Sequence, residues 1–243
     1  MRFLRPLLTS FFELLFPARC QGCDGQIASS RPPLLCPACR DRISRISSPL
    51  CTCCGAPFRT GTDRLCTVCQ DDTFAFDRAR SLFVYEEPLR TLILQLKFNG
   101  SLAGISTFAA LAEQADITAL FHEADLILPV PLHRNRLRQR GFNQSLLLAE
   151  ACFPAWKNKI RPALLRRHRA TVPQTRLNGA DRCTNLTGAF SLRDPQKVEG
   201  KRILLADDVQ TTGSTLNECA KVLAEAGAAE IEAFTVAGSR KVP

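Results

Sequence analysis

The fold is decided by Arg202-Ile203-Leu204-Leu205-Ala206-Asp207-Asp208-Val209-Gln210-Thr211-Thr212-Gly213-Ser214-Thr215-Leu216. The apolar run 203–206 predicts a strand that is buried on both faces, as in a parallel sheet. Apolar residues then recur at helical spacing from Leu216 to Ala224, which predicts a helix from about Ser214 to Gly227. Strand, short turn and helix in succession form the unit of an α/β fold.

The turn between this strand and this helix has the composition of an anion site. The backbone N–H groups of a first helical turn are unpaired and suit a phosphate. Hydroxyl donors are added by Thr211, Thr212, Ser214 and Thr215, and Gly213 lets the backbone approach a ligand closely. We expect Asp207 and Asp208 to face sugar hydroxyls or a hydrated Mg²⁺, because they would repel a phosphate. A phosphorylated ribose fits both the phosphate-binding turn and the acidic pair. The alternative is an ordinary turn with a solvated acidic pair.

The same stretch resembles the 5-phosphoribosyl-1-pyrophosphate (PRPP) motif of the type I phosphoribosyltransferases. That motif is an apolar run followed by Asp-Asp-Val-x-Thr-Thr-Gly-x-Thr, and residues 203–215 match all of it. The resemblance implies a parallel sheet flanked by helices, PRPP with Mg²⁺ as ligand, and Asp207 and Asp208 as catalytic residues. It implies that Thr211, Thr212, Gly213, Ser214 and Thr215 bind the phosphate. No glycine-rich loop ends in Gly-Lys-Ser/Thr, so a Walker-type NTPase is not supported.

Length and charge agree with this interpretation. The 243 residues suffice for one α/β core and a small additional module. The net charge of +9 favours an acidic ligand or partner such as phosphate, nucleic acid or anionic lipid. A generally basic protein without such a partner is the alternative.

Cysteine spacing predicts a double zinc ribbon over residues 18–75. Eight of the twelve cysteines form Cys-x-x-Cys pairs. They make two quartets with the spacing of structural Cys₄ zinc sites: Cys20, Cys23, Cys36 and Cys39, then Cys51, Cys54, Cys66 and Cys69. Iron–sulfur ligation and a crossed pairing of the Cys-x-x-Cys pairs remain open, and Cys53 is a spare. Confinement of these pairs to one part of the chain disfavours a secreted disulfide scaffold.

The N-terminal segment 1–17 predicts an amphipathic helix that packs on the protein. Basic residues precede an apolar region, as in a signal peptide, but Glu13 interrupts that region and no small-x-small cleavage site follows. The apolar run is too short for a transmembrane segment, and a membrane-surface helix is the alternative. Since zinc thiolates persist in a reducing compartment, we predict a cytoplasmic protein.

The remaining chain, 76–243, predicts one phosphoribosyltransferase-like domain. We expect strands at about 79–85, 125–131, 189–192 and 230–237, and helices at about 88–97, 101–120 and 143–152, with Asn143 as the cap of the last. Between them, residues 132–144 carry alternating arginines and predict a loop at the carboxyl end of a strand. That is the ligand side of an α/β sheet. Arginine grips pyrophosphate bidentately, whereas the plain alternative is a solvated basic loop.

A narrower resemblance involves Pro129-Val130-Pro131-Leu132-His133, Arg136 and Arg140-Gly141-Phe142-Asn143-Gln144. With Gln174, Leu177, Arg182 and Asn185 farther on, these residues resemble the signature of the ComF/GntX family. That family joins a double zinc ribbon to a phosphoribosyltransferase-like domain and is linked to competence, DNA uptake or DNA utilisation. The resemblance implies a pyrophosphate and loop set of His133, Arg136, Arg140, Gln174, Arg176 and Arg182.

Residues 166–186 predict a long polar loop, and such loops are usually functional or disordered. In type I transferases the equivalent loop closes over the reaction centre and often carries a lysine. No lysine occurs between Lys159 and Lys197, so we expect an arginine to substitute. The candidates are Arg169, Arg176 and Arg182.

Two functions are consistent with these features. The first is an Mg²⁺-dependent phosphoribosyltransferase whose acceptor the sequence does not identify. The second is a non-catalytic adaptor of DNA-uptake machinery. Its zinc ribbons and basic loops would bind single-stranded DNA or a helicase-like partner.

Overall fold

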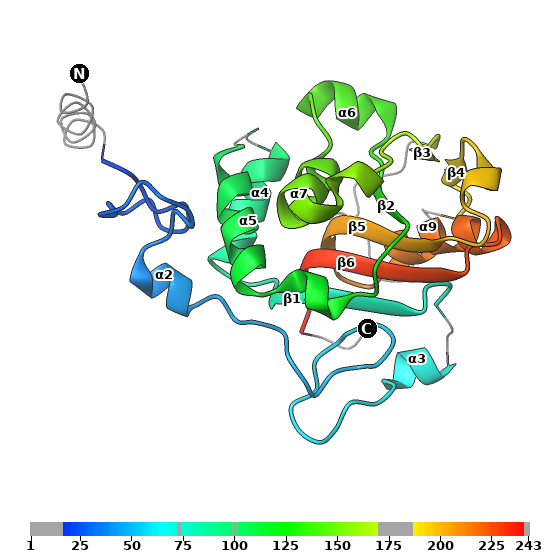
Figure 1. Ribbon diagram of the computed structural model, residues 1–243. Coiled ribbons are helices and arrows are strands. Elements are labelled where there is room, and N and C mark those ends of the chain that lie inside the picture. Colours follow the sequence, from blue (N-terminus) through cyan, green and yellow to red (C-terminus); the bar gives the residue numbers. More distant parts are fainter. Residues whose placement is uncertain (1–16, 72–73, 99, 101, 170–186, 241–243) are drawn as a thin grey trace.

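The computed structural model describes residues 17–71, 74–98, 100, 102–169 and 187–240, and its centre is a parallel sheet (Figure 1). The strands are β1 (Arg78–Val84), β2 (Leu126–Pro129), β5 (Arg202–Gln210) and β6 (Glu230–Gly238). They lie in the order β1-β6-β5-β2, and every neighbouring pair is parallel. The predicted α/β class with a parallel sheet is therefore confirmed.

Helices cover both faces of this sheet. Alternate side chains of β5 point to opposite faces: Leu204 and Ala206 pack in one core with α4 (Leu89–Phe98), α5 (Ala103–Gln114) and α7 (Gln144–Cys152). Ile203 and Leu205 pack in a second core with α9 (Ser214–Glu225). Because all four of these β5 residues are at most 2% exposed, β5 is anchored from both sides. This rigid strand carries the residues that follow Ala206.

A small antiparallel pair lies beside the main sheet. It consists of β3 (Leu165–Arg167) and β4 (Phe190–Leu192), and its strands enter and leave the long polar loop predicted at 166–186. Most of that loop, with Gln174, Arg176 and Arg182, lies outside the described residues. The predicted N-terminal helix also lies outside them, except for Pro17. Among the described helices, none is long and apolar enough to cross a membrane.

The structure corrects two predicted elements. The helix expected at 101–120 ends at Gln114, because Asp116 takes a left-handed conformation (φ 46°) before a short 3-10 helix, η1 (Ile117–Leu120). The predicted arginine loop is wrong, because its centre forms α6 (Arg134–Arg140). His133 caps this helix by accepting a hydrogen bond from the Asn135 N–H, and Gly141 ends it with φ 81°.

The cysteine-rich part contacts the sheet domain at two places (Figure 1). The first ribbon, with α2 (Pro37–Asp41), lies against α4 and α5, and its Leu35 and Cys39 belong to their core. The second ribbon, with α3 (Thr67–Asp71), lies beside β1. Two 3-10 helices complete the described chain: η2 (Pro154–Lys159) and η4 (Pro195–Lys197).

Candidate functional site

The site forms where the carboxyl ends of β2 and β5 lie side by side. Ligands of open α/β sheets bind outside this edge. Asp207 and Asp208 stand there, and they belong to β5 itself, which extends beyond the apolar run 203–206 from which the strand was predicted. β5 continues to Gln210 because it pairs with β6 as far as Gly238, so Asp207 is 9% exposed and Asp208 only 3%.

Burial dominates the chemistry of Asp207. Its Oδ1 accepts hydrogen bonds from the Ser145 hydroxyl at 2.8 Å and the Asp208 N–H at 2.9 Å. Burial, and then the neighbouring Asp208, raise the pKa of Asp207 to about 7, although Lys97 and these hydrogen bonds oppose the shift. A buried acidic pair of this kind requires a cation.

Lys97, at the end of α4, supplies a positive charge that sequence analysis missed. Its Nζ lies 2.9 Å from Asp208 Oδ2. Burial alone would lower the pKa of Lys97, but Asp208 and, more weakly, Asp207 raise it above its usual value. The sequence signal was only a lysine at the end of a predicted helix. Pairing with Asp208 depends on how α4 packs on the sheet.

The acidic pair also fits Mg²⁺. Asp208 Oδ2 is buried, and its described partner is the Lys97 ammonium at 2.9 Å. A carboxylate oxygen has two acceptor positions, so this contact leaves one for a cation. Carboxylate oxygens are the ligands that Mg²⁺ prefers in proteins, usually one or two together with water and substrate phosphates.

Arginines add to the positive charge around the pair. On α6, Arg140 donates to Gln144 Oε1 at 2.9 Å, and its guanidinium lies 5.4 Å from the centre of the Phe98 ring. Burial lowers the pKa of Arg140, while Asp208 and Asp207 partly offset that effect. Arg136 lies on the same helix. The structure thus brings Arg140 near the acidic pair, with Arg136 beside Arg140, and it shows His133 as the cap of α6.

A further arginine, Arg167 of β3, was not predicted as a site residue. It is 9% exposed, and its guanidinium lies 5.4 Å from the centre of the Phe190 ring. Burial and then Arg136 lower the pKa of Arg167, whereas Asp207 and the Cys219 thiol oppose this. Lys97, Arg140 and Arg167 therefore lie near one acidic pair, with Arg136 close to both arginines, and this charge suits a ligand that carries several negative charges.

The turn from β5 to α9 provides the anion-binding half. Gly213 precedes the helix with φ 76° and has no side chain to cap it, while the Thr212 hydroxyl accepts a hydrogen bond from the Ser214 N–H at 3.4 Å. The Thr212 hydroxyl pairs with the Ser214 hydroxyl at 2.8 Å. A Cβ on Gly213 would lie 3.2 Å from the Phe74 ring, so the backbone conformation and the neighbouring ring both favour glycine here.

The two cysteine quartets form compact clusters in sequential grouping. Cys20, Cys23, Cys36 and Cys39 make one, and Cys51, Cys54, Cys66 and Cys69 make the other. Facing sulfur atoms lie 3.8 Å apart in both, between Cys23 and Cys36 and between Cys54 and Cys66. Four thiolates at the usual Zn–S bond length of about 2.3 Å lie about 3.8 Å apart in a tetrahedron, so both clusters fit zinc. Cys53 belongs to neither cluster.

Protein purified without chelator should contain two zinc ions per chain, measured by plasma mass spectrometry. Cys20→Ser should remove one of them and make the first ribbon sensitive to protease, because structural zinc supplies much of the folding free energy of such modules. Cys51→Ser should remove the other. One zinc ion in the parent protein, or visible absorbance from iron, would contradict the assignment.

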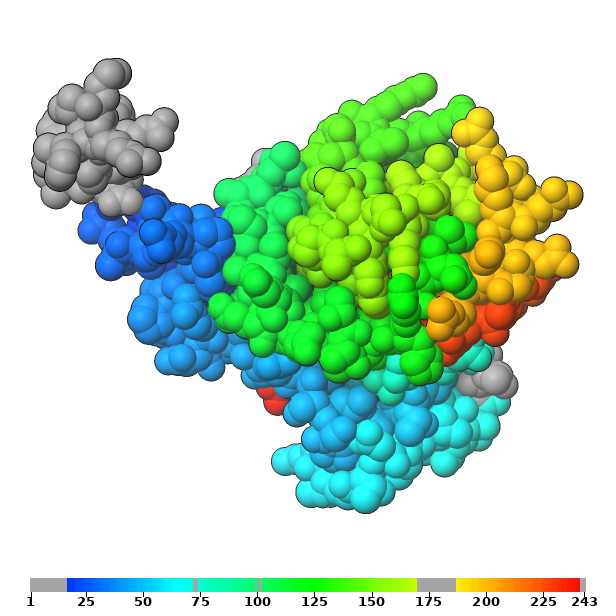
Figure 2. All heavy atoms as spheres, viewed as in Figure 1, coloured from blue at the N-terminus to red at the C-terminus, as the bar shows by residue number. Residues whose placement is uncertain are grey.

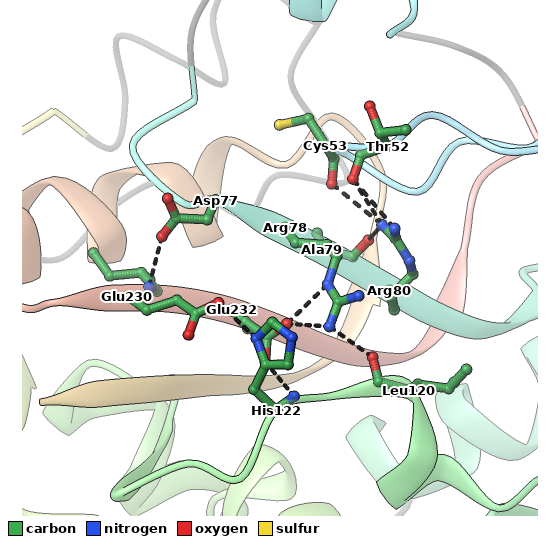
Figure 3. Close-up of polar contacts among 11 residues, drawn as sticks. Thr52, Cys53, Asp77, Arg78, Ala79, Arg80, Leu120, His122, Glu230 and Glu232 are labelled. Atoms are coloured by element: carbon green, nitrogen blue, oxygen red, sulfur yellow. Dashed lines mark hydrogen bonds and ion pairs between the residues drawn. The ribbon is translucent and has the colours of Figure 1, made fainter. Parts of the chain in front are cut away.

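A third group of side chains that could bind a metal ion instead forms structural hydrogen bonds. His122, Glu230 and Glu232 lie together at the amino edge of the sheet, opposite the acidic pair (Figure 3). Glu232 accepts hydrogen bonds from the Arg78 guanidinium and from the His122 N–H, and His122 Nδ1 contacts Glu230 at 2.8 Å. Both oxygens of Glu232 are thus already used in holding β1, β6 and the segment before β2 together.

Comparisons with known proteins agree with this architecture. The family model "Double zinc ribbon domain" matches residues 11–72, and "Phosphoribosyl transferase domain" matches residues 165–241. Competence protein F of Haemophilus influenzae is 32% identical over 227 residues, covering 91% of this chain and 97% of that protein. DNA utilization protein YhgH of Escherichia coli K12 is 34% identical, covering 82% of this chain and 88% of that protein. Competence protein ComFC of Bacillus subtilis is 28% identical, covering 83% of each.

A solved structure, the allosteric regulatory enzyme of purine biosynthesis, shares 24% identity with a TM-score of 0.36. The match covers 56% of this chain and 27% of that enzyme.

Proposed function

The chain belongs to the ComF family, and on that premise we propose that it binds PRPP with Mg²⁺ and acts as a phosphoribosyltransferase linked to DNA uptake or utilisation. One observation carries the proposal. The buried acidic pair of β5 is followed, after a turn that ends at Gly213, by the N-terminus of α9, and the cationic side chains of Lys97 and Arg140 lie near the pair. PRPP has a matching order of groups, with a 5-phosphate, two ribose hydroxyls and a pyrophosphate.

Each part of the site has a role in this proposal. Residues 211–215 and the first turn of α9 bind the 5-phosphate through N–H and hydroxyl donors. Asp207 and Asp208 face the ribose hydroxyls and hold hydrated Mg²⁺, which when bound neutralises charge on the pyrophosphate. Arg136, Arg140 and Lys97 contact the pyrophosphate oxygens.

The reaction needs positioning and charge stabilisation more than covalent help. The bond between the anomeric carbon and the pyrophosphate oxygen breaks, and its electron pair leaves with pyrophosphate. A bond from the acceptor to the same carbon replaces it. Positive charge develops on the ribose ring, beside the acidic pair, while negative charge grows on the leaving group, among the cationic side chains.

The test has two measurements. PRPP with Mg²⁺ should raise the melting temperature of the protein, because a ligand that binds only the folded state stabilises it by mass action. Release of pyrophosphate from PRPP is then measured over a panel of purine and pyrimidine bases. No shift in melting temperature at millimolar PRPP would contradict the proposal.

A pair of glycine variants sharpens this test. Gly213→Ala and Gly200→Ala both place a side chain at positive φ, 76° and 68°. At Gly200 a Cβ would meet nothing within 4 Å, and this position precedes β5 at the opposite end of the strand. Both variants should lose stability, Gly213→Ala somewhat more because its Cβ lies close to the Phe74 ring, whereas only Gly213→Ala should lose the response to PRPP.

An adaptor role is the second candidate. The described face of α6 exposes Arg134 and Arg138 with Leu137, which is 42% exposed, and the chain carries a net charge of +9. Such a surface suits the backbone of single-stranded DNA. A salt-dependent DNA titration on a protein that gives no response to PRPP would favour this role over the enzymatic one.

A further inference from the structure

The second zinc ribbon directly contacts the end of β5. Gln210 stands at the variable position of the PRPP-like motif, just before Thr211. Its Nε2 donates a 3.0 Å hydrogen bond to the backbone oxygen of Cys54, a member of the second cysteine quartet. The Gln210 side chain is 8% exposed, so this bond is shielded from water.

The same ribbon is fixed to β1, the edge strand of the sheet. The Ala79 N–H donates to the Cys53 oxygen at 2.7 Å, and the Arg80 guanidinium donates to the Thr52 oxygen at 3.2 Å (Figure 3). Gly55 has φ 73°, and a Cβ there would lie 2.5 Å from the Ala79 oxygen. The Cys51-x-x-Cys54 turn is therefore pressed closely against the sheet and can serve as a rigid support.

The chain that leaves this ribbon forms a second connection to the phosphate loop, residues 211–215. The Phe74 ring stacks on Phe76 and lies against Gly213. The Ala75 N–H donates to Asn217 Oδ1 in the first turn of α9 at 2.7 Å. The space-filling view shows the second ribbon in continuous contact with the body of the protein (Figure 2).

The first ribbon offers an internal comparison, because its described contacts lead elsewhere. The Leu34 N–H donates to the Thr107 hydroxyl of α5 at 3.0 Å, and Gly22 lies against Pro88 before α4. The two clusters have the same ligands and similar spacing. They differ in the part of the sheet domain that they support.

We infer that the second cysteine cluster, when it holds zinc, positions the phosphate loop, and that Gln210 is the positioning residue that connects the two. This inference rests on the proposed function only for the identity of the ligand. Ligand binding at 211–215 then requires metal in the second cluster and tolerates loss of metal from the first.

The decisive variant is Gln210→Met, which keeps the length of the side chain and removes its donor. It should retain two zinc ions and lose only a few degrees of melting temperature, because the Cys54 oxygen loses one buried hydrogen bond, while the affinity for PRPP with Mg²⁺ falls about tenfold in calorimetry. Gln21→Met, the same substitution inside the first Cys-x-x-Cys turn, should leave the affinity unchanged. An unchanged affinity in Gln210→Met would overturn the inference.

A second arm compares the metal clusters themselves. Cys23→Ser and Cys69→Ser should each lose one zinc ion, and only Cys69→Ser should lose the response to PRPP. Equal effects of the two variants, in either direction, would contradict the inference.

Hydrogen exchange without ligand separates this inference from the proposed function. The amides of residues 211–214 should exchange faster in Gln210→Met than in the parent protein, whether or not PRPP binds. If the parent fails to bind PRPP, the proposed function fails, and exchange alone decides the coupling. Unchanged exchange would refute it.

Discussion

Asp207→Asn is expected to abolish Mg²⁺-dependent PRPP binding and, at pH 8, to raise the melting temperature of the ligand-free protein. The loss of binding follows because asparagine is a neutral and weaker ligand for a hydrated cation. The gain in stability follows from the raised pKa of Asp207, about 7 in the folded protein against an ordinary value of 3.8. Because burial destabilises the charged form of this carboxyl group, the charged group lowers the free energy of unfolding.

A carboxyl group whose pKa is raised by folding binds its proton more tightly in the folded state, so it destabilises the protein as pH rises from about 4 to about 7. Above pH 7 the full cost is present, and asparagine removes it. With about 1.4 kcal/mol per pKa unit as the upper scale, discounted for coupling to Asp208, we expect a gain of about 1–3 kcal/mol at pH 8. At pH 8 this gain should raise the melting temperature by roughly 2–4 °C per kcal/mol. At pH 4 we expect no gain.

Asp125→Asn is the matched control. The Arg202 N–H donates to Asp125, and this hydrogen bond is the main cause that lowers the pKa of that carboxyl. Its stabilisation is present above the ordinary pKa and is lost as pH falls. The control should therefore lower the melting temperature slightly at pH 8 and keep the response to PRPP. Equal stabilisation by Asp207→Asn at pH 4 and pH 8, or retained PRPP binding, would contradict our account of Asp207.

Residue patterns within one segment predicted the strands, helices and cysteine quartets that depend on that segment alone. The run 203–206 and the helical spacing after it placed β5 and α9 to within a few residues, and cysteine spacing identified two quartets. The burial of Asp207 and Asp208 could not be read in this way. It depends on β6, which pairs with β5 beyond the apolar run and extends the strand to Gln210.

The unpredicted site residues share a cause. Lys97 and Arg167 come from elements far from β5 in the sequence, and only the strand order and the packing of α4 bring them to the acidic pair. Gln210 occupies a position at which the motif accepts any residue, so the motif carries no signal for it. In contrast, α6 had a local signal that was missed, since Arg138 and Arg140 followed by Gly141 are suited to end a helix.

Lys97→Met is expected to lower the melting temperature strongly, because it leaves Asp208 as a buried charge without its cation. Lys97 is 20% exposed and Asp208 5% in their side chains, so solvent screens the pair only weakly. Removing one partner of a buried pair typically costs about 3–5 kcal/mol. At roughly 2–4 °C per kcal/mol, the drop should be about 10 °C.

A double variant separates the lost charge from lost packing. Lys97→Met with Asp208→Asn removes both charges at nearly constant volume, and buried ion pairs replaced by neutral groups often recover their stability. We expect the double variant to regain most of the melting temperature and to show no response to PRPP. A double variant as unstable as Lys97→Met would mean that the lysine acts through packing of its aliphatic stem.

Titration with Mg²⁺ tests whether Lys97 and the metal ion share Asp208. In the parent protein Lys97 already neutralises Asp208, so Mg²⁺ without PRPP should change the melting temperature little. In Lys97→Met the unpaired oxygen of Asp208 is open to a cation, and Mg²⁺ should restore part of the lost stability in a concentration-dependent way. PRPP should still bind this variant, but more weakly, since one contact to the pyrophosphate is gone. If Mg²⁺ stabilises the parent and the variant equally, Lys97 and the metal do not share Asp208, and the lysine has no part in the ligand site.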